Sequence, residues 1–201
     1  MKYIKLAVSF NFGEVTSVVI ASVLLPFLPI TPIQLLVQSL LYDLGQLTLP
    51  FDNVDEEYLQ KPKRWNINDL KKFMLFMGPL SSSFDMIIFA FMWFVFGIRE
   101  AAVFQTIWFS YGVVSNLIGM HIIRTAKVPF VQSNANKFVY LSSIVLSIVA
   151  IIVPYTALGH IIGLVSISPT FLSIIIGVPI LYCIVALFAK RFYIRKYREW
   201  I

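Results

Sequence analysis

Charged residues are scarce in this chain. They make up 13% of its 201 residues, whereas 59% are hydrophobic; soluble domains carry about 25% charged and about 45–50% apolar residues. A chain of this size cannot hide so much apolar surface inside itself, so lipid must cover the rest. The low charge content excludes a soluble globular protein and indicates a membrane protein.

Cysteine and histidine are also rare. The single cysteine, Cys183, excludes a disulfide within the chain, and we interpret it as a small packing residue. The two histidines, His121 and His160, have no metal-ligand spacing around them, which argues against a zinc site. We predict that both histidines lie at the surface, at span ends or in loops.

Long apolar runs are what the chain has in abundance. A helix needs about 20 residues to cross the hydrocarbon region of a bilayer, and six runs of about that length are present. They predict an all-α, polytopic membrane protein with six transmembrane helices in a single unit, residues 1–201. The predicted spans are 6–27, 31–50, 73–96, 102–120, 138–156 and 170–189.

The connections between spans carry further signals. Three prolines in PFLPITP (26–32) end the first helix and turn the chain, so the first two spans are predicted to be antiparallel neighbours. The link 51–72 is long, charged and polar. The span 102–120 is the least apolar, because it contains Gln105, Ser110, Ser115 and Asn116.

Basic residues set the predicted orientation. With six spans both termini share one side, and of the 16 lysines and arginines only Arg99 falls on the other side. The positive-inside rule makes the basic side cytoplasmic, so both termini and loop 51–72 are predicted to face the cytoplasm of a cell-membrane protein. The net charge of +6 is explained in this way, and nucleic acid is not expected as a partner. The tail 190–200 is interpreted as an interfacial anchor in the lipid.

Three acids, Glu14, Asp43 and Asp85, fall inside predicted spans. An ionisable group at the bilayer centre costs about 2.5–3.5 kcal/mol on insertion scales, so it usually faces the protein interior and marks an ion path or a polar partner. Glu14 and Asp43 lie at similar distances from the turn that joins their spans. At about 1.5 Å per residue, both are expected about 18–20 Å from that turn, near mid-membrane.

Further polar residues share helical faces with these two acids. Asn11 precedes Glu14 by three residues; Ser39 precedes Asp43 by four, with Tyr42 and Gln46 on the same broad face. Oxygen ligands without histidine or cysteine suit a hard cation such as Mg²⁺ or Ca²⁺. The alternative is a hydrogen-bonded cluster that holds two spans together. Asp85 follows Ser81 and Ser82 by one turn, and either joins the ion path or pairs with a polar group on another span.

The same residues carry a family resemblance. The stretches NFGEV and PFLPITPIQLLVQSLLYDLGQLTLPFDNVD resemble the fifth and sixth membrane helices of P-type ATPases. KPKRWN, FMLFMGPLSSSFD and HIIRTAKVPFVQS resemble the magnesium-transporting branch. The resemblance covers nearly the whole chain, in order, as the last six of ten membrane helices.

The resemblance implies a set of cation ligands. The calcium-transporting branch carries N-x-x-E on its fifth helix and N-x-x-T-D on its sixth. Asn11 and Glu14 match the first pattern, and Asp43 matches the closing aspartate of the second. Tyr42 resembles the magnesium branch, while Ser39 departs from the asparagine of both. The resemblance also implies that loop 51–66 supports the phosphorylation domain of a pump.

The motifs that are missing limit the implied activity. No DKTGT, TGES or GDGxND is present, so the chain has no phosphorylated aspartate and no ATP site, and we expect it not to be catalytic alone. We expect a C-terminal part: a fragment, a truncated reading frame or a separately encoded piece. Its partners would be membrane lipid and the missing N-terminal and cytoplasmic pump domains.

Two functions follow from these observations. The first is the C-terminal transport domain of an ATP-driven P-type Mg²⁺ transporter, in which Asn11, Glu14, Asp43 and Ser39 form part of one intramembrane cation site. Tyr42, Gln46 and Asp85 are weaker candidates for the same role. The alternative is a non-catalytic membrane protein that associates with or regulates a full-length pump, or a degenerate remnant.

Overall fold

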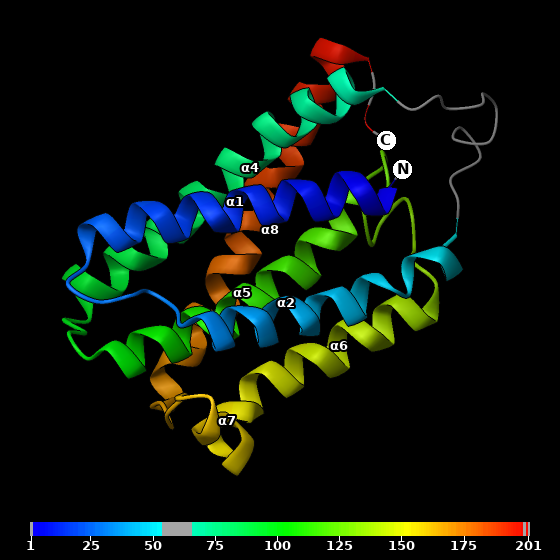
Figure 1. Ribbon diagram of the computed structural model, residues 1–201. Coiled ribbons are helices and arrows are strands. Elements are labelled where there is room, and N and C mark those ends of the chain that lie inside the picture. Colours follow the sequence, from blue (N-terminus) through cyan, green and yellow to red (C-terminus); the bar gives the residue numbers. More distant parts are fainter. Residues whose placement is uncertain (1, 54–65, 199, 201) are drawn as a thin grey trace.

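The computed structural model describes residues 2–53, 66–198 and 200, and within these ranges the chain is almost entirely helical (Figure 1). The only pairing of β type in the described residues is one isolated bridge between Pro129 and Ser133. The helices are α1 (Lys2–Leu24), α2 (Pro32–Gln46), η1 (Leu49–Phe51), α4 (Ile67–Ala90), η2 (Phe91–Val95), α5 (Ala101–Ile123), α6 (Lys137–Ile152), η3 (Val153–Tyr155), α7 (Ala157–Ile161), η4 (Pro169–Phe171) and α8 (Leu172–Tyr197). The predicted all-α class is confirmed.

Five helical segments of the described chain are long and apolar enough to cross a membrane. They correspond to five of the six predicted spans. The remaining one, 31–50, is shorter than predicted, because α2 has 15 residues and ends at Gln46. At about 1.5 Å per residue, α2 is about 22 Å long. After the end of α2, Thr48 precedes the 3-10 turn η1 and Pro50 lies within it.

The turn between α1 and α2 follows the proline signal. α1 ends at Leu24, and Thr31 caps α2 by accepting a hydrogen bond from the backbone N–H of Gln34. The Gln34 side chain accepts in return from the backbone N–H of Thr31 at 3.0 Å, which completes a capping box. Pro32 occupies the first turn, where its missing N–H costs nothing.

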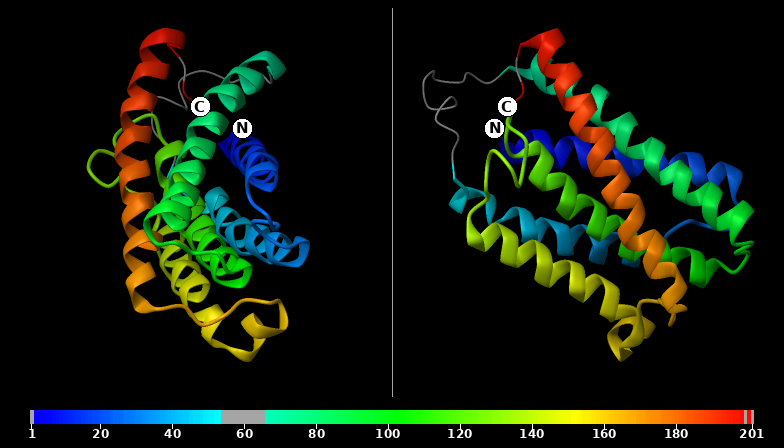
Figure 2. Two further views of the ribbon diagram at one scale, coloured as in Figure 1. Left: turned by 90° about the vertical axis from the view of Figure 1, so that its left-hand side faces the viewer. Right: turned by 180° about the vertical axis from the view of Figure 1, so that it is seen from behind.

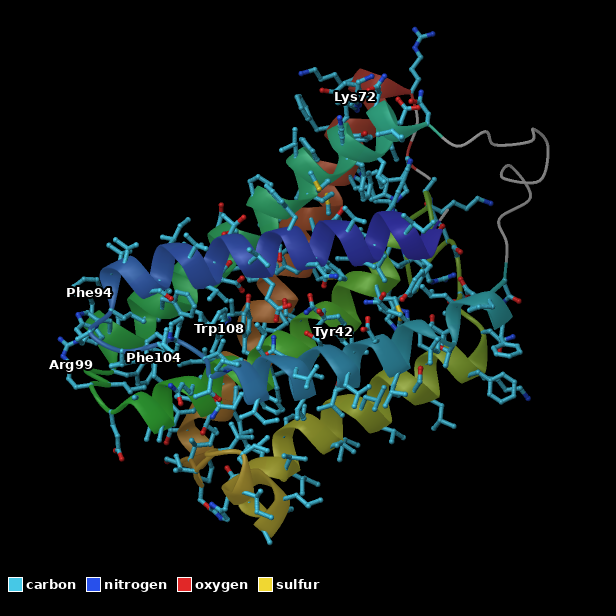
Figure 3. All side chains as sticks on the ribbon, viewed as in Figure 1. Tyr42, Lys72, Phe94, Arg99, Phe104 and Trp108 are labelled. Atoms are coloured by element: carbon cyan, nitrogen blue, oxygen red, sulfur yellow. The ribbon has the colours of Figure 1, made fainter. Side chains whose placement is uncertain are left out.

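Both termini lie at the same end of the bundle, beside the end of α2 and the connection between α5 and α6 (Figures 1 and 2). We call this the basic end. Lys72 lies there, whereas Arg99 lies at the opposite end (Figure 3). Arg99 stacks its guanidinium on the ring of Trp93, 3.6 Å from the ring centre. Residues 54–65 of the predicted loop 51–72, and with them the predicted contact with a phosphorylation domain, lie outside the described residues.

α5 is the central helix, packed against α1, α2, α6 and α8 and almost completely buried (Figure 2). This position explains why its sequence is the least apolar of the predicted spans. Gln105 donates to the carbonyl of Leu28 at 2.8 Å, and Ser110 donates to the carbonyl of Ala150 at 2.9 Å. A helix surrounded by protein can carry such groups because its neighbours, not lipid, satisfy them.

Among the described helices, α1 packs most closely on α4. The two helices approach closely at Gly13, where a Cβ atom would lie 3.0 Å from the carbonyl oxygen of Gly78. Small residues at such a crossing let two membrane helices approach closely. α1 and α2 are antiparallel neighbours, as predicted (Figure 1), but they meet through side chains, such as Tyr42 with Asn11, and their backbones pack less closely than those of α1 and α4.

A buried ion pair holds the basic end together. Arg124, at the end of α5, donates to the carboxylate of Asp52 at 2.7 Å, and the two side chains are 1% and 2% exposed. Arg124 also donates to the carbonyl of Ser133 at 2.7 Å, and Asp52 accepts from the backbone N–H of Asn136 at 3.1 Å. The pair therefore joins the segment after α2 to both ends of the connection between α5 and α6.

The C-terminal tail differs from its predicted role as an anchor in lipid. Lys190, Tyr193 and Trp200 are buried, while Arg191 and Phe192 are exposed. Lys190 donates to the carbonyl of Ile122 at 2.9 Å, and the Trp200 indole donates to the carbonyl of Ile123 at 3.0 Å. Lys190 and Trp200 therefore supply hydrogen bonds to two of the last carbonyls of α5, which have no partner N–H within their own helix.

The histidine predictions are half right. His160 is exposed, as predicted, but His121 is only 3% exposed. The His121 ring stacks on Tyr140, with ring centres 5.2 Å apart, and its Nε2 forms a hydrogen bond of 3.0 Å with Ser143. α6 covers this face of α5, which the sequence could not show.

Arg124→Leu is expected to destabilise the chain strongly. It leaves the Asp52 carboxylate buried without its cation, a change that typically costs about 3–5 kcal/mol. Lys72→Leu is the matched control, because Lys72 forms an exposed pair of 3.6 Å with Asp69, and exposed pairs contribute about 0–1 kcal/mol. Thermal unfolding of the detergent-purified variants measures both effects. An equal fall in Tm for the two variants would contradict the structural role of the Arg124 pair.

Candidate functional site

A cleft of about 380 Å³ with both polar and apolar walls opens between α1 and α2. α1 contributes Asn11 and Glu14, and α2 contributes Ser39, Tyr42 and Asp43. Apolar side chains of the same two helices form the rest of its wall: Val15, Val18, Val19 and Leu35. The structure thus gathers five of the seven candidate ligands around one opening.

Tyr42 lies at the centre of this group, between α1 and α2 (Figure 3). Its hydroxyl is 2.8 Å from Asn11 Oδ1, 3.1 Å from Glu14 Oε2 and 3.2 Å from Ser39 Oγ. A single phenol proton can satisfy only one acceptor at a time. The hydroxyl therefore links three oxygen-bearing side chains and leaves most of their lone pairs available.

Gln38 is a site residue that the sequence reasoning missed. Its side-chain amide donates to Glu14, and the residue is 1% exposed. A signal for it was present, because Gln34, Gln38, Tyr42 and Gln46 recur every four residues and are all buried on one face of α2. Such a polar stripe on an apolar helix indicates a face turned toward protein.

Asp85 lies apart from the cleft. It lines a second, smaller cavity of about 10 Å³ together with Glu14, Gln38 and Ser81. Ser17 of α1 donates to its carboxylate at 2.5 Å and lies 3.0 Å from Ser82. Asp85 therefore pairs with a polar group on another span, which is one of the two roles predicted for it.

The two remaining candidates occupy different positions. Asp43 is partly exposed on the wall of the cleft, next to Tyr42. Gln46 is buried on the same face of α2, but it is not among the residues that line either cavity. Among the residues that the structure describes, Glu14 alone lines both cavities, so it is the junction between them.

The polar groups of the cleft are of the type that hard cations prefer. Its polar groups are carboxylates, an amide, a hydroxyl and a phenol, and no lysine or arginine of the described residues lines it. Mg²⁺ and Ca²⁺ prefer such oxygen ligands, and Mg²⁺ keeps several of its own waters, so few protein groups are needed. The residues on α1 and α2 fit a partly hydrated divalent cation.

Comparison with known proteins identifies relatives over the whole chain. The family model "Cation transporting ATPase, C-terminus" matches residues 27–192. The chain is similar to "Magnesium-transporting ATPase, P-type 1" of Salmonella typhimurium strain LT2, with 40% identity over 203 residues, 100% of this chain and 22% of that protein. It is also similar to the protein of the same name from Escherichia coli strain K12, with 42% identity over 200 residues, 98% of this chain and 22% of that protein.

These matches agree with the resemblance carried by the motifs around Glu14, Asp43 and Asp85. The chain spans about a fifth of the length of the relatives that it matches. Its match to the family model extends from the turn after α1 to the basic tail of α8. The chain is a multi-pass membrane protein that belongs to the cation-transporting ATPase C-terminus family and corresponds to the C-terminal region of the magnesium-transporting P-type ATPases.

Proposed function

We propose that this chain supplies part of the intramembrane Mg²⁺ site of an ATP-driven transporter. Asn11 and Glu14 on α1, with Ser39, Tyr42 and Asp43 on α2, would bind the partly hydrated cation. The observation that carries the proposal is their convergence on one cleft of about 380 Å³ that no basic side chain lines. The names of the relatives, which refer to magnesium transport, support the choice of cation.

The cleft is open on one side, and this supports a role as one part of a larger site. Asn11 is exposed and Asp43 is partly exposed, although both lie on helices of a membrane protein. Polar groups in such a position are expensive in contact with lipid. A further helix of the complete transporter, from the part of the relatives that this chain does not match, would cover them and complete the ligand set.

The energy for transport would come from outside the described chain. ATP hydrolysis requires phosphate-binding and phosphorylation groups, and none of their sequence motifs is present here. We propose that the basic end faces the cytoplasm, where such domains would act on α1 and α2. The buried Arg124–Asp52 pair at that end would give them a rigid base.

Mg²⁺ binding tests the proposed site directly. Titration calorimetry of the 201-residue chain in detergent is expected to show binding, and Glu14→Gln with Asp43→Asn is expected to remove it, because the two carboxylates supply the negative charge of the cleft. Glu100→Gln is the matched control, since Glu100 is an exposed acid that precedes α5 at the opposite end. Binding that survives in the double variant with unchanged affinity would reject the site.

Tyr42→Phe is expected to weaken Mg²⁺ binding about tenfold. The change removes one hydroxyl that organises Asn11, Glu14 and Ser39, and a hydrogen bond of this kind contributes about 0.5–1.5 kcal/mol, or up to about a factor of ten in affinity. Tyr155→Phe is the control, because Tyr155 donates to the carbonyl of Ile167 outside the cleft. Equal affinities for the two variants would remove Tyr42 from the site.

The proposed orientation can be tested with cysteine labelling. In a Cys183→Ser background, Val131→Cys places an exposed thiol between α5 and α6, and Ser166→Cys places one in the connection after α7. A membrane-impermeant maleimide applied to intact cells is expected to label Ser166→Cys, and to label Val131→Cys only after permeabilisation. The reverse pattern would place the basic end outside the cell.

A further inference from the structure

The two oxygens of the Glu14 carboxylate have different surroundings. Oε1 accepts a hydrogen bond from the side-chain amide of Gln38, a residue that lines the smaller cavity and is not among those around the cleft. Oε2 lies 3.1 Å from the hydroxyl of Tyr42, which lines the cleft and is not among the residues of the smaller cavity. Glu14 therefore presents Oε2 toward the cleft and holds Oε1 away from it.

Gln38 is itself held in place by α5. Gln38 is 1% exposed, and its amide lies against Gly112, where a Cβ atom would be 2.5 Å from Nε2 and 2.9 Å from Cδ. The lack of a side chain at position 112 leaves room for the amide beside Glu14. α5 is thus connected to the cleft through Gln38, although none of the described residues of α5 lines the cleft.

The hydroxyl of Tyr42 does not occupy Oε2 in the same way. It lies closer to Asn11 Oδ1, at 2.8 Å, than to Glu14 Oε2, and a phenol has a single proton to donate. When that proton is directed to Asn11, both Oε2 and the phenol oxygen are available to a cation in the cleft.

The number of oxygens that a carboxylate offers affects Mg²⁺ and Ca²⁺ differently. Mg²⁺ requires near-octahedral geometry with short bonds, and it binds through one or two carboxylates beside several of its own waters. Ca²⁺ takes about six to eight oxygen ligands in a flexible geometry and accepts both oxygens of one carboxylate. A carboxylate that offers a single oxygen therefore suits Mg²⁺ better than Ca²⁺.

We propose that Gln38 sets the preference of the cleft for Mg²⁺ over Ca²⁺, because its hydrogen bond occupies Oε1 and leaves Oε2 as the one oxygen that Glu14 gives to the ion. Gln38 is a positioning residue and does not touch the cation. Hydrogen bonds to a charged carboxylate are stronger than those between neutral groups, so two-oxygen binding by Glu14 has to compete with this bond. The proposal rests on the proposed function, since it assigns selectivity to the same site.

Calorimetric titration of the full chain in lipid nanodiscs, with MgCl₂ and separately with CaCl₂, measures the preference as a ratio of two dissociation constants. Gln38→Met keeps the length of the side chain and removes the amide donor. It is expected to shift the ratio about tenfold toward Ca²⁺, as the loss of one hydrogen bond to a charged group predicts. Gly112→Ala keeps Gln38 but pushes its amide away from its present position, so a shift in the same direction is expected.

Two matched variants control for general damage to the packing. Gln105→Met removes another buried amide, which donates to the carbonyl of Leu28 at 2.8 Å and lines neither cavity. Gly119→Ala adds a Cβ atom on the same helix as Gly112, 2.6 Å from Cζ of Phe10, which does not line the cleft. Both controls are expected to leave the ratio unchanged.

Infrared difference spectra of the same samples report the coordination itself. With carbon-13 in the glutamate carboxylates, the separation between the antisymmetric and symmetric stretching bands is larger for one-oxygen than for two-oxygen coordination. The native chain with MgCl₂ is expected to show the larger separation, and Gln38→Met with CaCl₂ the smaller one. The larger separation in Gln38→Met with CaCl₂ would contradict the proposal.

The outcomes distinguish the role of Gln38 from the cation site as such. Binding of both cations with one ratio in native, Gln38→Met and Gly112→Ala chains would overturn the role of Gln38 and keep the site. An equal loss of affinity for both cations in the two variants would also overturn it, because the hydrogen bond is proposed to set the preference. A native chain that binds neither cation would overturn the proposed function together with this selectivity.

Discussion

A carboxylate inside a membrane protein has no bulk water to solvate it, and the packing of three helices in this chain, α1, α2 and α4, follows from that constraint. Glu14 receives a hydrogen bond from the amide of Gln38 and lies 3.1 Å from the hydroxyl of Tyr42, both on α2. Asp85 receives one from Ser17 on α1. Each acid on one helix is therefore satisfied by a neighbouring helix, which ties α1 to both α2 and α4. The cost of leaving either acid unpaired makes this arrangement specific.

At the basic end, the groups that need partners are backbone carbonyls, and side-chain N–H donors supply the hydrogen bonds. Helix ends leave carbonyls without partners, and Lys190 and Trp200 bind those of Ile122 and Ile123 at the end of α5. Arg124 binds Asp52 and the carbonyl of Ser133. Residues whose sequence suggests attraction to lipid headgroups are thus used inside the protein. The basic end is therefore held together by buried polar contacts, whereas the cleft near the middle of α1 leaves Asn11 exposed.

The sequence predicted the part of this structure that depends on composition and on local spacing. The apolar runs located five helices that are long enough to cross a membrane, and the prolines of 26–32 ended α1 and began α2. The spacing of Asn11 with Glu14, and of Ser39 with Asp43, identified residues that the structure places around one cleft. These signals succeed because a helix has a fixed period and a fixed rise, so spacing along the chain determines which face a residue occupies.

Composition and spacing alone determined that this protein is helical, crosses a membrane and carries acids that must face protein. The tertiary structure decided which helices and side chains these acids contact. The short turn makes α1 and α2 neighbours that meet through side chains, whereas the backbone of α1 packs more closely on α4, where glycines lie at 13 and 78. The burial of His121 and Lys190, and the contact of Gln38 with Glu14, arise from residues far apart in sequence. No local pattern encodes such contacts, because they depend on how whole helices pack.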